Sequence, residues 1–530
     1  MKFFRTHILV SKDSKSMFAG AETVEKLLVE EIKKQGLGEE IKVISTGSIG
    51  FEGTGVTIAV YPDGIVYSPV TVSDIPEIVS EHLLKGRVVK RIAFPIKTSK
   101  MPSGVTFPEK VIGIQKRIVL KNVGFINPEN IEEYIAQDGY SALAKSLCDM
   151  KPSDVISLIT ASELRGRGGA GYPTGLKWAA AAEVKGDCKY IICNADEGEP
   201  GTFKDREIME GDPHTLLEGM AIAGYAVGAS VGYIYIRGEY AISINRLNKA
   251  IEDARSYGLL GKNILGSGFD FEIEIKKGAG AYVCGEESAL IESIEGSRGE
   301  PRKKPPYPVV SGLWAKPTVV NNVETLANVP RILENGAEWY KSLGTEGSRG
   351  TKLFSLMGDI KWKGVIEIPF GTPLSKIVMN IAGGLKNNAK LKAVILGGVS
   401  GYLIKPEELD IPVDFNSLAR IEAGPGSGSI IVLDDSRDIV DIVKNIAEFF
   451  KHESCGKCTP CRIGTDQICE IIDRFFYDEG SEDDLNKLMR LSETMFQTSF
   501  CALGQTAPNI LQQSLKKFRG DWERHFFKSE

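Results

Sequence analysis

Four cysteines near the carboxyl end give the clearest chemical signal in the chain. Cys455, Cys458 and Cys461 form a C-x2-C-x2-C run, and Cys501 follows in a later segment with helical spacing. Iron–sulfur clusters take four thiolate ligands, and two successive two-residue spacers place three thiolates on one tight turn. A structural zinc site more often joins two separated C-x2-C halves. The spacing therefore predicts one [4Fe–4S] cluster, rather than zinc or a set of buried thiols without a metal.

A glycine-rich segment, Gly166–Gly171, satisfies the pattern G-x-G-x-x-G. The pattern alone is a weak signal, and the segment before it has helical rather than strand-like spacing, so the usual dinucleotide fold fits poorly. The loop still suits an anionic cofactor. Its glycines allow close backbone approach, Arg165 and Arg167 add charge, and a helix beginning near Leu176 offers free N–H groups and the amine of Lys177. The alternative is a tight turn with solvated arginines.

Three further polar clusters follow the same logic. Residues 194–201 come directly after the strand-like run 190–193, and residues 278–287 follow the strand-like run 271–275. A last cluster covers residues 319–325. Polar groups just past the carboxyl ends of strands are where α/β sheets place ligands. Each cluster alone could be a solvated turn or a helix start, but together with the glycine loop they favour one shared cofactor pocket.

These motifs make the chain recognisable. Residues 164–178, with the sequence LRGRGGAGYPTGLKW, resemble the NADH-binding flavoprotein subunit of respiratory complex I. The relatives of that flavoprotein include the diaphorase subunits of NAD-linked or electron-bifurcating hydrogenases and of formate dehydrogenases. Further motifs of the family occur in its order at residues 194–201, 280–288, 301–308, 321–325 and 453–462. The resemblance extends from about residue 120 to the carboxyl end.

The resemblance implies FMN and NAD(H) as cofactors of one α/β domain. The residues that would surround FMN are Gly166, Arg167, Lys177, Asn194, Tyr282, Gly285, Glu286, Asn321 and Asn322. Those that would face the dinucleotide are Glu199, Glu287 and Lys304, with Tyr172 and Tyr307 where the family usually has Phe. The cofactor-binding set is completed by Gly168, Gly169, Ala170, Gly171, Asp196, Glu197 and Thr325. Hydride transfer needs no side-chain base, so no catalytic residue is expected.

Glu287 also implies a cofactor preference. A carboxylate there can accept hydrogen bonds from an adenosine ribose, and it would repel a 2′-phosphate. We therefore expect NAD(H) rather than NADP(H).

The N-terminal region departs from the family in one respect. It resembles the thioredoxin-like domain that precedes the flavoprotein in hydrogenase-type subunits, where a [2Fe–2S] cluster is held by a C-x4-C pair and a C-x3-C pair. The four ligand positions here are Ser11, Ser16, Ser48 and Glu52, and no cysteine occurs before Cys148. Hydroxyls and one carboxylate cannot replace four thiolates. We therefore expect an empty scaffold without a [2Fe–2S] cluster.

The elements that must position these residues predict an α/β multidomain protein. We expect a thioredoxin-like domain over residues 1–95, with the order βαβββ and a closing helix over 75–84. A connector and a helix follow over 96–150, and the FMN- and NAD(H)-binding domain covers 151–340. A small β-grasp-like (SLBB) unit is expected over 345–432. A helical bundle over 437–530 would hold the [4Fe–4S] cluster.

Composition excludes several other functions. The net charge of −6 argues against a nucleic-acid-binding face. The longest uncharged stretch, residues 219–236, predicts a glycine-containing helix followed by a buried strand rather than a membrane span. The N-terminus reads as a first strand and not as a signal peptide. These features predict a cytoplasmic protein that does not insert directly into a membrane.

The resulting hypothesis is an NAD(H)-dependent oxidoreductase subunit. Hydride would pass between NAD(H) and FMN, and single electrons would pass through the [4Fe–4S] cluster to another subunit. Expected partners are a small thioredoxin-like [2Fe–2S] subunit and a larger iron–sulfur catalytic subunit of hydrogenase or formate dehydrogenase type, with ferredoxin as a further candidate. The alternatives are a stand-alone diaphorase, the NADH-input subunit of a membrane quinone oxidoreductase, and a scaffold whose cofactor sites have decayed.

Overall fold

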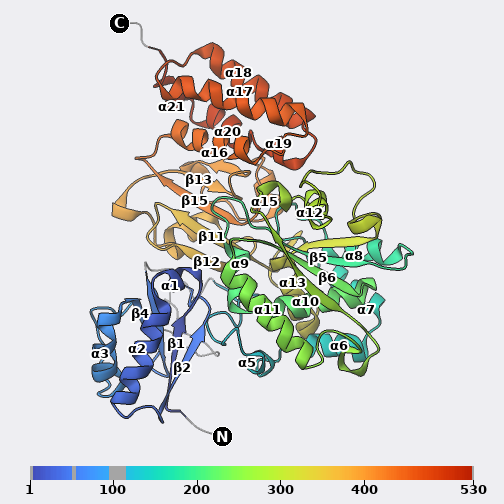
Figure 1. The fold of residues 1–530 in the computed structure, drawn as a ribbon. Coiled ribbons are helices and arrows are strands. Elements are labelled where there is room, and N and C mark those ends of the chain that lie inside the picture. The colour runs from blue at the N-terminus through green and yellow to red at the C-terminus, as the bar shows by residue number, and fades with distance from the viewer. Residues whose placement is uncertain (1–3, 51–54, 95–114, 528–530) are drawn as a thin grey trace.

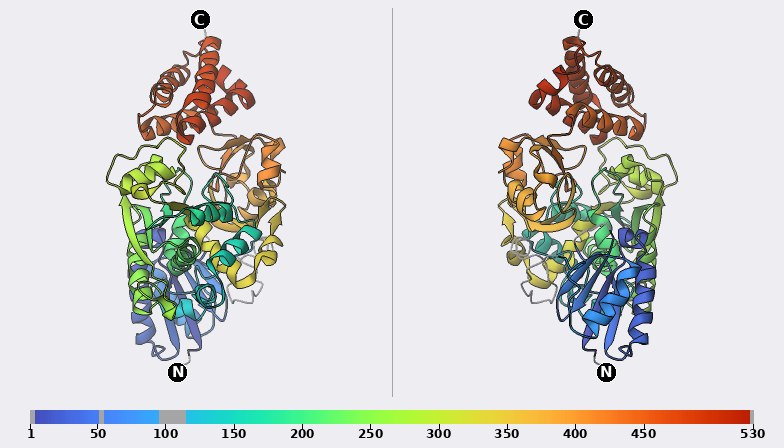
Figure 2. Two further views of the ribbon diagram at one scale, coloured as in Figure 1. Left: turned by 90° about the vertical axis from the view of Figure 1, so that its right-hand side faces the viewer. Right: turned by 90° about the vertical axis from the view of Figure 1, so that its left-hand side faces the viewer.

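The computed structural model describes residues 4–50, 55–94 and 115–527. Its units follow one another along the molecule, so that the N-terminal sheet and the C-terminal helices lie at opposite ends (Figures 1 and 2). Two sheet-containing units lie between these ends. The chain therefore runs from one end of the molecule to the other through the two middle units.

The N-terminal unit is a four-stranded sheet in the order β2-β1-β3-β4. β1 and β2 are parallel, and the other two pairs are antiparallel. The strands are β1 (Thr6–Ser11), β2 (Ile41–Thr46), β3 (Val56–Tyr61) and β4 (Ile65–Val70). Helix α2 (Ala21–Lys34) buries Val24, Leu28 and Ile32 at helical spacing. This is the βαβββ order that the sequence predicts for a thioredoxin-like unit.

The closing helix of this unit differs from the prediction of one helix over 75–84. It consists of a 3₁₀ turn (Val72–Asp74), a short α-helix α3 (Ile75–Glu77) and a π-helical turn (Ile78–Leu83). Within the π-helical turn, the His82 ring and the Tyr67 hydroxyl share a buried hydrogen bond of 2.8 Å.

The second unit contains a parallel sheet in the order β7-β6-β5-β8. The strands are β5 (Tyr190–Ala195), β6 (Val231–Arg237), β7 (Glu272–Gly278) and β8 (Thr318–Asn322). Helices cover it: α7 (Pro152–Ala161), α8 (Thr174–Glu183), α9 (Lys204–Gly211), α10 (Pro213–Val227), α11 (Ala241–Ser256), α12 (Glu287–Ile294) and α13 (Val323–Asn335). The apolar runs of β5 and β6 fit strands that are buried on both faces. The stretch 219–236 is the end of α10 followed by β6, as predicted.

The third unit is a mixed five-stranded sheet in the order β12-β11-β15-β13-β14. Its strands are β11 (Thr351–Gly358), β12 (Gly364–Pro369), β13 (Leu391–Leu396), β14 (Tyr402–Ile404) and β15 (Ser429–Asp434). β11 and β15 are parallel, and the remaining neighbours are antiparallel. Short helices α5 (Ile131–Ile135), α6 (Ser141–Asp149), α14 (Ala337–Lys341) and α15 (Phe415–Ala419) lie in the connecting segments.

In the described residues 439–527, six helices form the C-terminal unit. They are α16 (Ile439–Glu453), α17 (Thr459–Phe476), α18 (Glu482–Thr498), α19 (Ala502–Thr506), α20 (Asn509–Lys517) and α21 (Arg519–Glu523). Cys458 precedes the first residue of α17, and Cys501 precedes that of α19. Among the described residues, no helix has both the length and the apolar character needed to cross a bilayer.

The N-terminal unit packs on the second unit around one buried carboxylate, that of Glu210 on α9. The Ser14 amide N–H donates to Glu210 Oε2 (2.8 Å), and the Ser14 hydroxyl donates to Oε1 (2.5 Å). Arg246 on α11 donates to the carbonyl oxygens of both Glu210 and Lys12. Gly47 fits against Gly211 so closely that an added Cβ would lie 2.6 Å from the Gly211 Cα. The docking therefore depends on a carboxylate, a guanidinium and small residues.

We expect Glu210→Ala to loosen this docking, because the Ser14 amide loses its acceptor. A hydrogen bond to a charged group contributes about 1.5–3 kcal/mol, so amide hydrogen exchange in residues 12–18 should accelerate about tenfold or more. Mass spectrometry of deuterium uptake measures this rate. Glu22→Ala, on the exposed face of α2, is the matched control and should leave the rate unchanged. Equal rates in wild type and Glu210→Ala would contradict the docking role.

Candidate functional site

The glycine loop lies between α7 and α8, against the first turn of α13. The Arg167 amide N–H donates to Thr325 Oγ1 (2.8 Å), and the Gly166 amide donates to the Tyr172 carbonyl (2.9 Å). Gly169 has a φ of +137°, which other residues rarely adopt, and a Cβ at Gly168 would lie 3.1 Å from the Asn322 Cβ. Ala170 is exposed, whereas Gly171 is buried against the Phe415 ring. The loop is thus fixed in shape and has little side-chain bulk.

The Arg167 side chain has a different role from the one that the sequence suggests. All three guanidinium nitrogens donate to protein oxygens: Nε to the Thr351 carbonyl (3.1 Å), Nη1 to the Arg165 carbonyl (2.8 Å), and Nη2 to the Tyr340 hydroxyl (2.8 Å). The side chain is 1 % exposed. It therefore anchors the loop to the third unit rather than offering its charge to a phosphate, so at most its backbone can face a cofactor.

The carboxyl ends of β5 and β8 bring the predicted asparagines together. Asn194 and Asn322 are register partners across the two strands. The Asn194 side-chain amide donates to the Gly285 carbonyl (2.8 Å), which ties β5 to the turn before α12. Asn321 Oδ1 accepts from the Trp178 indole (2.8 Å), and Asn322 caps α13 through its bond from the Glu324 amide (3.0 Å). Parallel pairing therefore places motifs that are more than a hundred residues apart at one sheet edge.

The three acidic residues after β5 have separate environments. Asp196 Oδ2 is buried with no hydrogen-bond partner among the described residues, and burial raises the pKa of Asp196 to about 7. Glu197 accepts from the Asp205 amide (2.9 Å) at the start of α9, and burial together with the Asp205 charge raises its pKa to about 7. Glu199 accepts from the Ser400 hydroxyl (2.5 Å) of the third unit. Asp196 is therefore the member of this group that lacks a partner.

A chain of charged residues connects α8, α12 and the loop after α12. The Lys177 ammonium lies 3.3 Å from Glu287 Oε2 and donates to the Val320 carbonyl (3.1 Å). The Lys304 ammonium bridges Glu286 (2.7 Å) and Glu287 (2.8 Å). Burial alone would raise the pKa of Glu287, but the charges of Lys177 and Lys304 outweigh it and lower that pKa. Glu287 is thus held as a carboxylate at the start of α12.

The three predicted aromatic residues divide into two kinds. Tyr172 and Tyr307 are 55 % and 57 % exposed, so their ring faces are open to a planar ligand. Tyr282 instead packs against the Phe449 ring of α16, with ring centroids 5.4 Å apart, and its amide donates to Glu453 (2.9 Å). Tyr282 therefore joins the second unit to the C-terminal helices.

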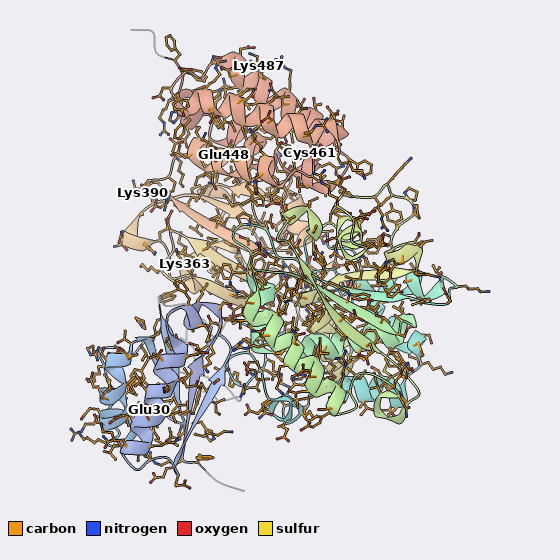
Figure 3. The ribbon with its side chains drawn as sticks, viewed as in Figure 1. Glu30, Lys363, Lys390, Glu448, Cys461 and Lys487 are labelled. Carbon is orange, nitrogen blue, oxygen red and sulfur yellow. The ribbon has the colours of Figure 1, made fainter. Side chains whose placement is uncertain are left out.

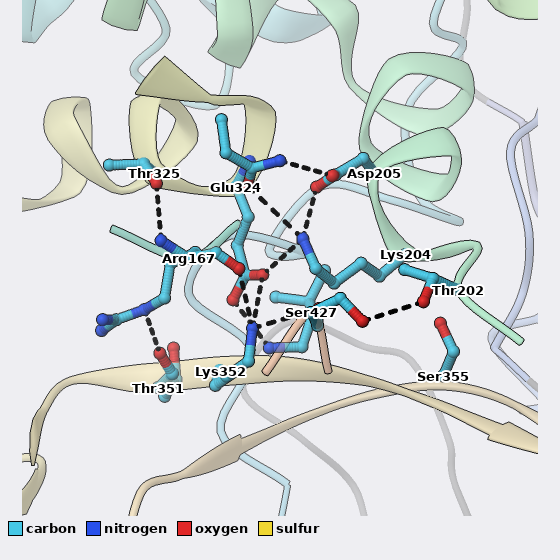
Figure 4. Close-up of polar contacts among 12 residues, drawn as sticks. Arg167, Thr202, Lys204, Asp205, Glu324, Thr325, Thr351, Lys352, Ser355 and Ser427 are labelled. Atoms are coloured by element: carbon cyan, nitrogen blue, oxygen red, sulfur yellow. Dashed lines mark hydrogen bonds and ion pairs between the residues drawn. The ribbon is translucent and has the colours of Figure 1, made fainter. Parts of the chain in front are cut away.

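A buried ionic network beside the glycine loop was not predicted from the sequence (Figure 4). The Lys204 ammonium lies 2.7 Å from Asp205 and 2.8 Å from Glu324, and the Lys352 ammonium lies 3.4 Å from the same Glu324 oxygen. Lys352 also donates to the Arg167 carbonyl (3.0 Å), while Asn322 donates to Asp205 (2.6 Å). Burial lowers the pKa of Lys352 to about 8. The only sequence signal for this network is a lysine inside an apolar strand.

The four cysteines of the predicted cluster line one cavity. Cys455, Cys458, Cys461 and Cys501 all contribute to its wall. Figure 3 shows Cys461 at the base of the helical unit, toward the sheets, and Lys487 on its far side. Among the described residues, no three His, Cys, Asp or Glu side chains lie close enough to hold a single metal ion. Four thiols lining one cavity are the ligand set of a [4Fe–4S] cluster.

Two of these thiols, Cys461 and Cys501, lie in an environment whose burial raises the pKa of each. Burial, followed by the charges of Cys458, Cys501 and Cys455, raises the pKa of Cys461 to about 11. Iron binding must therefore displace protons, as thiolate ligation generally does. Cys469 lies on the same helix but outside the cavity wall. It is a buried thiol.

The cysteine cavity shares a wall with the predicted flavin loops. Val283 and Pro301 of the second unit line it. The Lys457 ammonium donates to the Pro301 carbonyl (2.7 Å), and Arg298 donates to the Cys455 carbonyl (2.8 Å). Val283 adjoins Tyr282 and Pro301 is three residues from Lys304, so the predicted FMN- and dinucleotide-binding segments contact the cysteine segment directly.

The described serines at the N-terminal ligand positions take part in local hydrogen bonds. The hydroxyl oxygens of Ser11 and Ser16 are 2.7 Å apart, and the Ser16 hydroxyl donates to Asp13 (2.7 Å). Ser48 accepts from the Gly50 amide (3.2 Å). Glu52 lies outside the described residues. Each of the three serines thus has at least one hydrogen-bond partner within its own unit.

Comparisons with known proteins agree with this geometry. Residues 159–331 match the family model of the Nuo51 FMN-binding domain, and residues 441–525 match that of the NADH-ubiquinone oxidoreductase-F iron–sulfur binding region. The NADP-reducing hydrogenase subunit HndC of Solidesulfovibrio fructosivorans is 52% identical over 411 residues, covering 78% of this chain and 84% of the relative. The chain belongs to the complex I 51-kDa family.

Two further members of the family show its breadth. The F-type subunit of the NADH-quinone oxidoreductase of Aquifex aeolicus is 49% identical over 412 residues, covering 78% of this chain and 95% of the relative. A crystal structure of an NAD⁺-reducing [NiFe]-hydrogenase in the H2-reduced state is similar with a TM-score of 0.70 and 32% identity, covering 100% of this chain and 86% of that chain. As a member of this family, the chain is an NADH-dehydrogenase-type electron-transfer subunit with an FMN-binding domain and a [4Fe–4S]-binding region.

The residues present fit both groups. The glycine loop leaves backbone open beside Asn322, and the buried Asp196 Oδ2, which has no partner among the described residues, can bond a group of a bound cofactor. The four-thiol cavity has the donor chemistry of an iron–sulfur cluster.

Cys461→Ser tests the cluster ligands against a control on the same helix. We expect iron to fall from about four atoms per chain toward zero, because a serine hydroxyl replaces one thiolate of the set. Flavin content should stay unchanged. Cys469→Ser, eight residues further along α17, should retain full iron. Iron assay and the EPR spectrum of the reduced protein measure both variants, and equal iron loss in the two would contradict the assignment.

Proposed function

We propose that the chain moves electrons between NAD(H) and a partner subunit through FMN and one [4Fe–4S] cluster held by Cys455, Cys458, Cys461 and Cys501. The wall shared by the cysteine cavity and the segments around Tyr282 and Pro301 supports this order. Direct contact between the two sites means that electrons need cross no intervening domain. The family match supports the same sequence of carriers.

The proposed roles follow from position. Bound FMN would exchange hydride with the nicotinamide as a two-electron unit and release electrons singly. The glycine loop, Asn194, Asp196, Asn321 and Asn322 would hold the flavin. Tyr172 and Tyr307 would present their ring faces to the dinucleotide, and Glu287 and Lys304 would orient its ribose and phosphates. Glu197 and Thr325 support the site by holding α9 and the loop.

Rapid mixing with NADH under anaerobic conditions tests the proposed order. In wild-type protein, flavin bleaching should precede the appearance of the reduced-cluster EPR signal. In Cys461→Ser, flavin bleaching should remain while the cluster signal is lost. Protein that contains FMN but does not bleach with NADH would overturn the proposal.

The same geometry supports a preference for NAD(H). Glu287 is held as a carboxylate by two lysines, so its negative charge would repel the 2′-phosphate of NADP(H). One relative is named for NADP, so members of the family differ in this respect. A tighter apparent affinity for NADPH than for NADH in steady-state assays would overturn the preference.

Glu287→Gln should shift this preference toward NADPH. Removing a like-charge contact while leaving Lys177 and Lys304 in place should lower the ratio of kcat/KM for NADH to that for NADPH by about tenfold. Steady-state ferricyanide reduction with each dinucleotide measures the ratio. Glu183→Gln, at the exposed end of α8, is the matched control. A ratio that stays at the wild-type value in Glu287→Gln would refute the role of this carboxylate.

We further propose that the N-terminal unit, residues 1–95, carries no [2Fe–2S] cluster. The hydrogen bonds among Ser11, Asp13 and Ser16, and the docking of this segment on Glu210, support a purely structural role. Iron quantitation on the isolated chain should give about four atoms, the content of a single [4Fe–4S] cluster. About six atoms together with a [2Fe–2S] EPR signal would be the contrary result.

The remaining assignments follow as parts of the same proposal. The strand order β12-β11-β15-β13-β14 supports a β-grasp-like (SLBB) unit over 345–432, between the flavin domain (151–340) and the helical cluster domain (437–530). Residues 96–150 connect the first two domains. Partners would be a small thioredoxin-like [2Fe–2S] subunit and a larger iron–sulfur catalytic subunit, as in a hydrogenase or formate dehydrogenase. A cytoplasmic location stays a prediction.

A further inference from the structure

A second cavity lies away from the cysteines, on the side of the molecule where α13 ends. It encloses about 580 Å³ between the segment 116–121, α6, the last turn of α13 and α14. Ligand pockets are commonly of this size. The side chains on which the argument depends are Lys116, Lys121, Lys145, Arg331, Glu334 and Trp339. No residue of the proposed FMN, dinucleotide or cluster sites lines it.

The lining is predominantly basic. Five basic side chains, those above and Arg117, face two acidic ones, Asp138 and Glu334. Lys121 and Lys145 each donate to a carbonyl, those of Gln137 (3.2 Å) and Leu333 (2.8 Å), which fixes where their charges lie. An ammonium has three donors, so such a bond leaves further donors for a ligand. The cavity therefore favours an anion.

One of the basic residues, Arg331, is buried in the wall of the cavity. The Arg331 side chain is 2% exposed, its Nη1 donates to Glu334 (2.8 Å), and its Nη2 donates to Thr215 (3.3 Å). Its Nε is buried and has no hydrogen-bond partner among the described residues. Glu334, together with Asp212 and Glu218 behind the wall, balances its charge. The net positive charge offered to a ligand thus comes mainly from the lysines at the rim.

We propose that this cavity binds a nucleoside polyphosphate. Trp339 on α14 lines the cavity with its indole partly exposed, and an indole face is a stacking surface for a base. Lys116 and Lys121, on the segment 116–121 of the wall, supply charge for phosphates. One aromatic face together with several basic groups is the combination that binds a nucleotide. Inorganic phosphate would contact the basic groups but not the indole.

The cavity also connects to the glycine loop through short contacts. Trp339 is followed by Tyr340, whose hydroxyl accepts from Arg167 (2.8 Å) and donates to Asn328 of α13 (3.0 Å). The same helix begins with the Asn322 cap at the proposed flavin site. A ligand on Trp339 would therefore contact the element that positions the loop, although it would not touch the loop itself.

Tryptophan fluorescence of the holoprotein tests the site. ADP should quench the emission of wild type, and the difference between wild type and Trp339→Phe isolates the signal of this cavity from binding at the dinucleotide site. Lys116→Gln/Lys121→Gln should weaken this ADP-dependent signal about tenfold in Kd, because two charged donors are lost. Lys390→Gln, on the far edge of the third unit (Figure 3), is the matched control and should bind as wild type does.

Two further probes separate the contributions of base and phosphate. Adenosine and pyrophosphate should each bind at least about tenfold more weakly than ADP, because each offers half of the contacts. Adenosine binding as tightly as ADP would overturn the role of the lysines, and pyrophosphate binding as tightly as ADP would overturn the role of Trp339. Absence of a Trp339-dependent signal with ADP, or equal weakening in Lys390→Gln, would overturn the site.

Discussion

The buried carboxylate of Glu324 is the constraint on which the proposed flavin site depends. It has no solvent contact, so its charge must be met inside the protein, and Lys204 and Lys352 approach it from two different units. The Leu353 amide donates to its second oxygen (2.8 Å). Burial would raise the pKa of Glu324, but the two lysines and Arg167 outweigh it and lower that pKa. Removing one partner of such a group typically costs about 3–5 kcal/mol, so the two sheets are held in one arrangement.

This arrangement fixes the glycine loop without using the charges that a cofactor would need. Lys352 holds the Arg167 carbonyl, and the Arg167 guanidinium is occupied by β11 and α14. In the proposed function, the backbone of Gly168–Gly171 would face the flavin, while Lys177 on α8 pairs with Glu287. On the opposite side of the same domain, Tyr282 and Pro301 contact the C-terminal helices. In the proposed function, the flavin domain is therefore the central domain of the electron path. The third unit contacts it on one side and the C-terminal unit on the other.

The N-terminal unit contacts the flavin domain through one short segment. Hydrogen bonds join Ser11, Asp13 and Ser16 within this segment, and the adjacent Ser14 is bound to Glu210 of the flavin domain. The segment therefore serves as an interface between these two units.

The sequence alone determined the features that depend on local spacing. The C-x2-C-x2-C run, the glycine loop and the strands β5 and β7 follow from residues close together in the chain, and the family resemblance extended these to the cofactors. The closing helix over 75–84 is present, but most of it is π-helical rather than α-helical. Only the tertiary structure decided which charged and polar side chains pair with one another. Lys352 pairs with Glu324, Arg167 faces α14, Glu199 bonds Ser400, and Ser14 reaches Glu210. These pairs are separated by 28 to 201 residues, and no periodicity in a sequence specifies contacts between elements that only packing brings together.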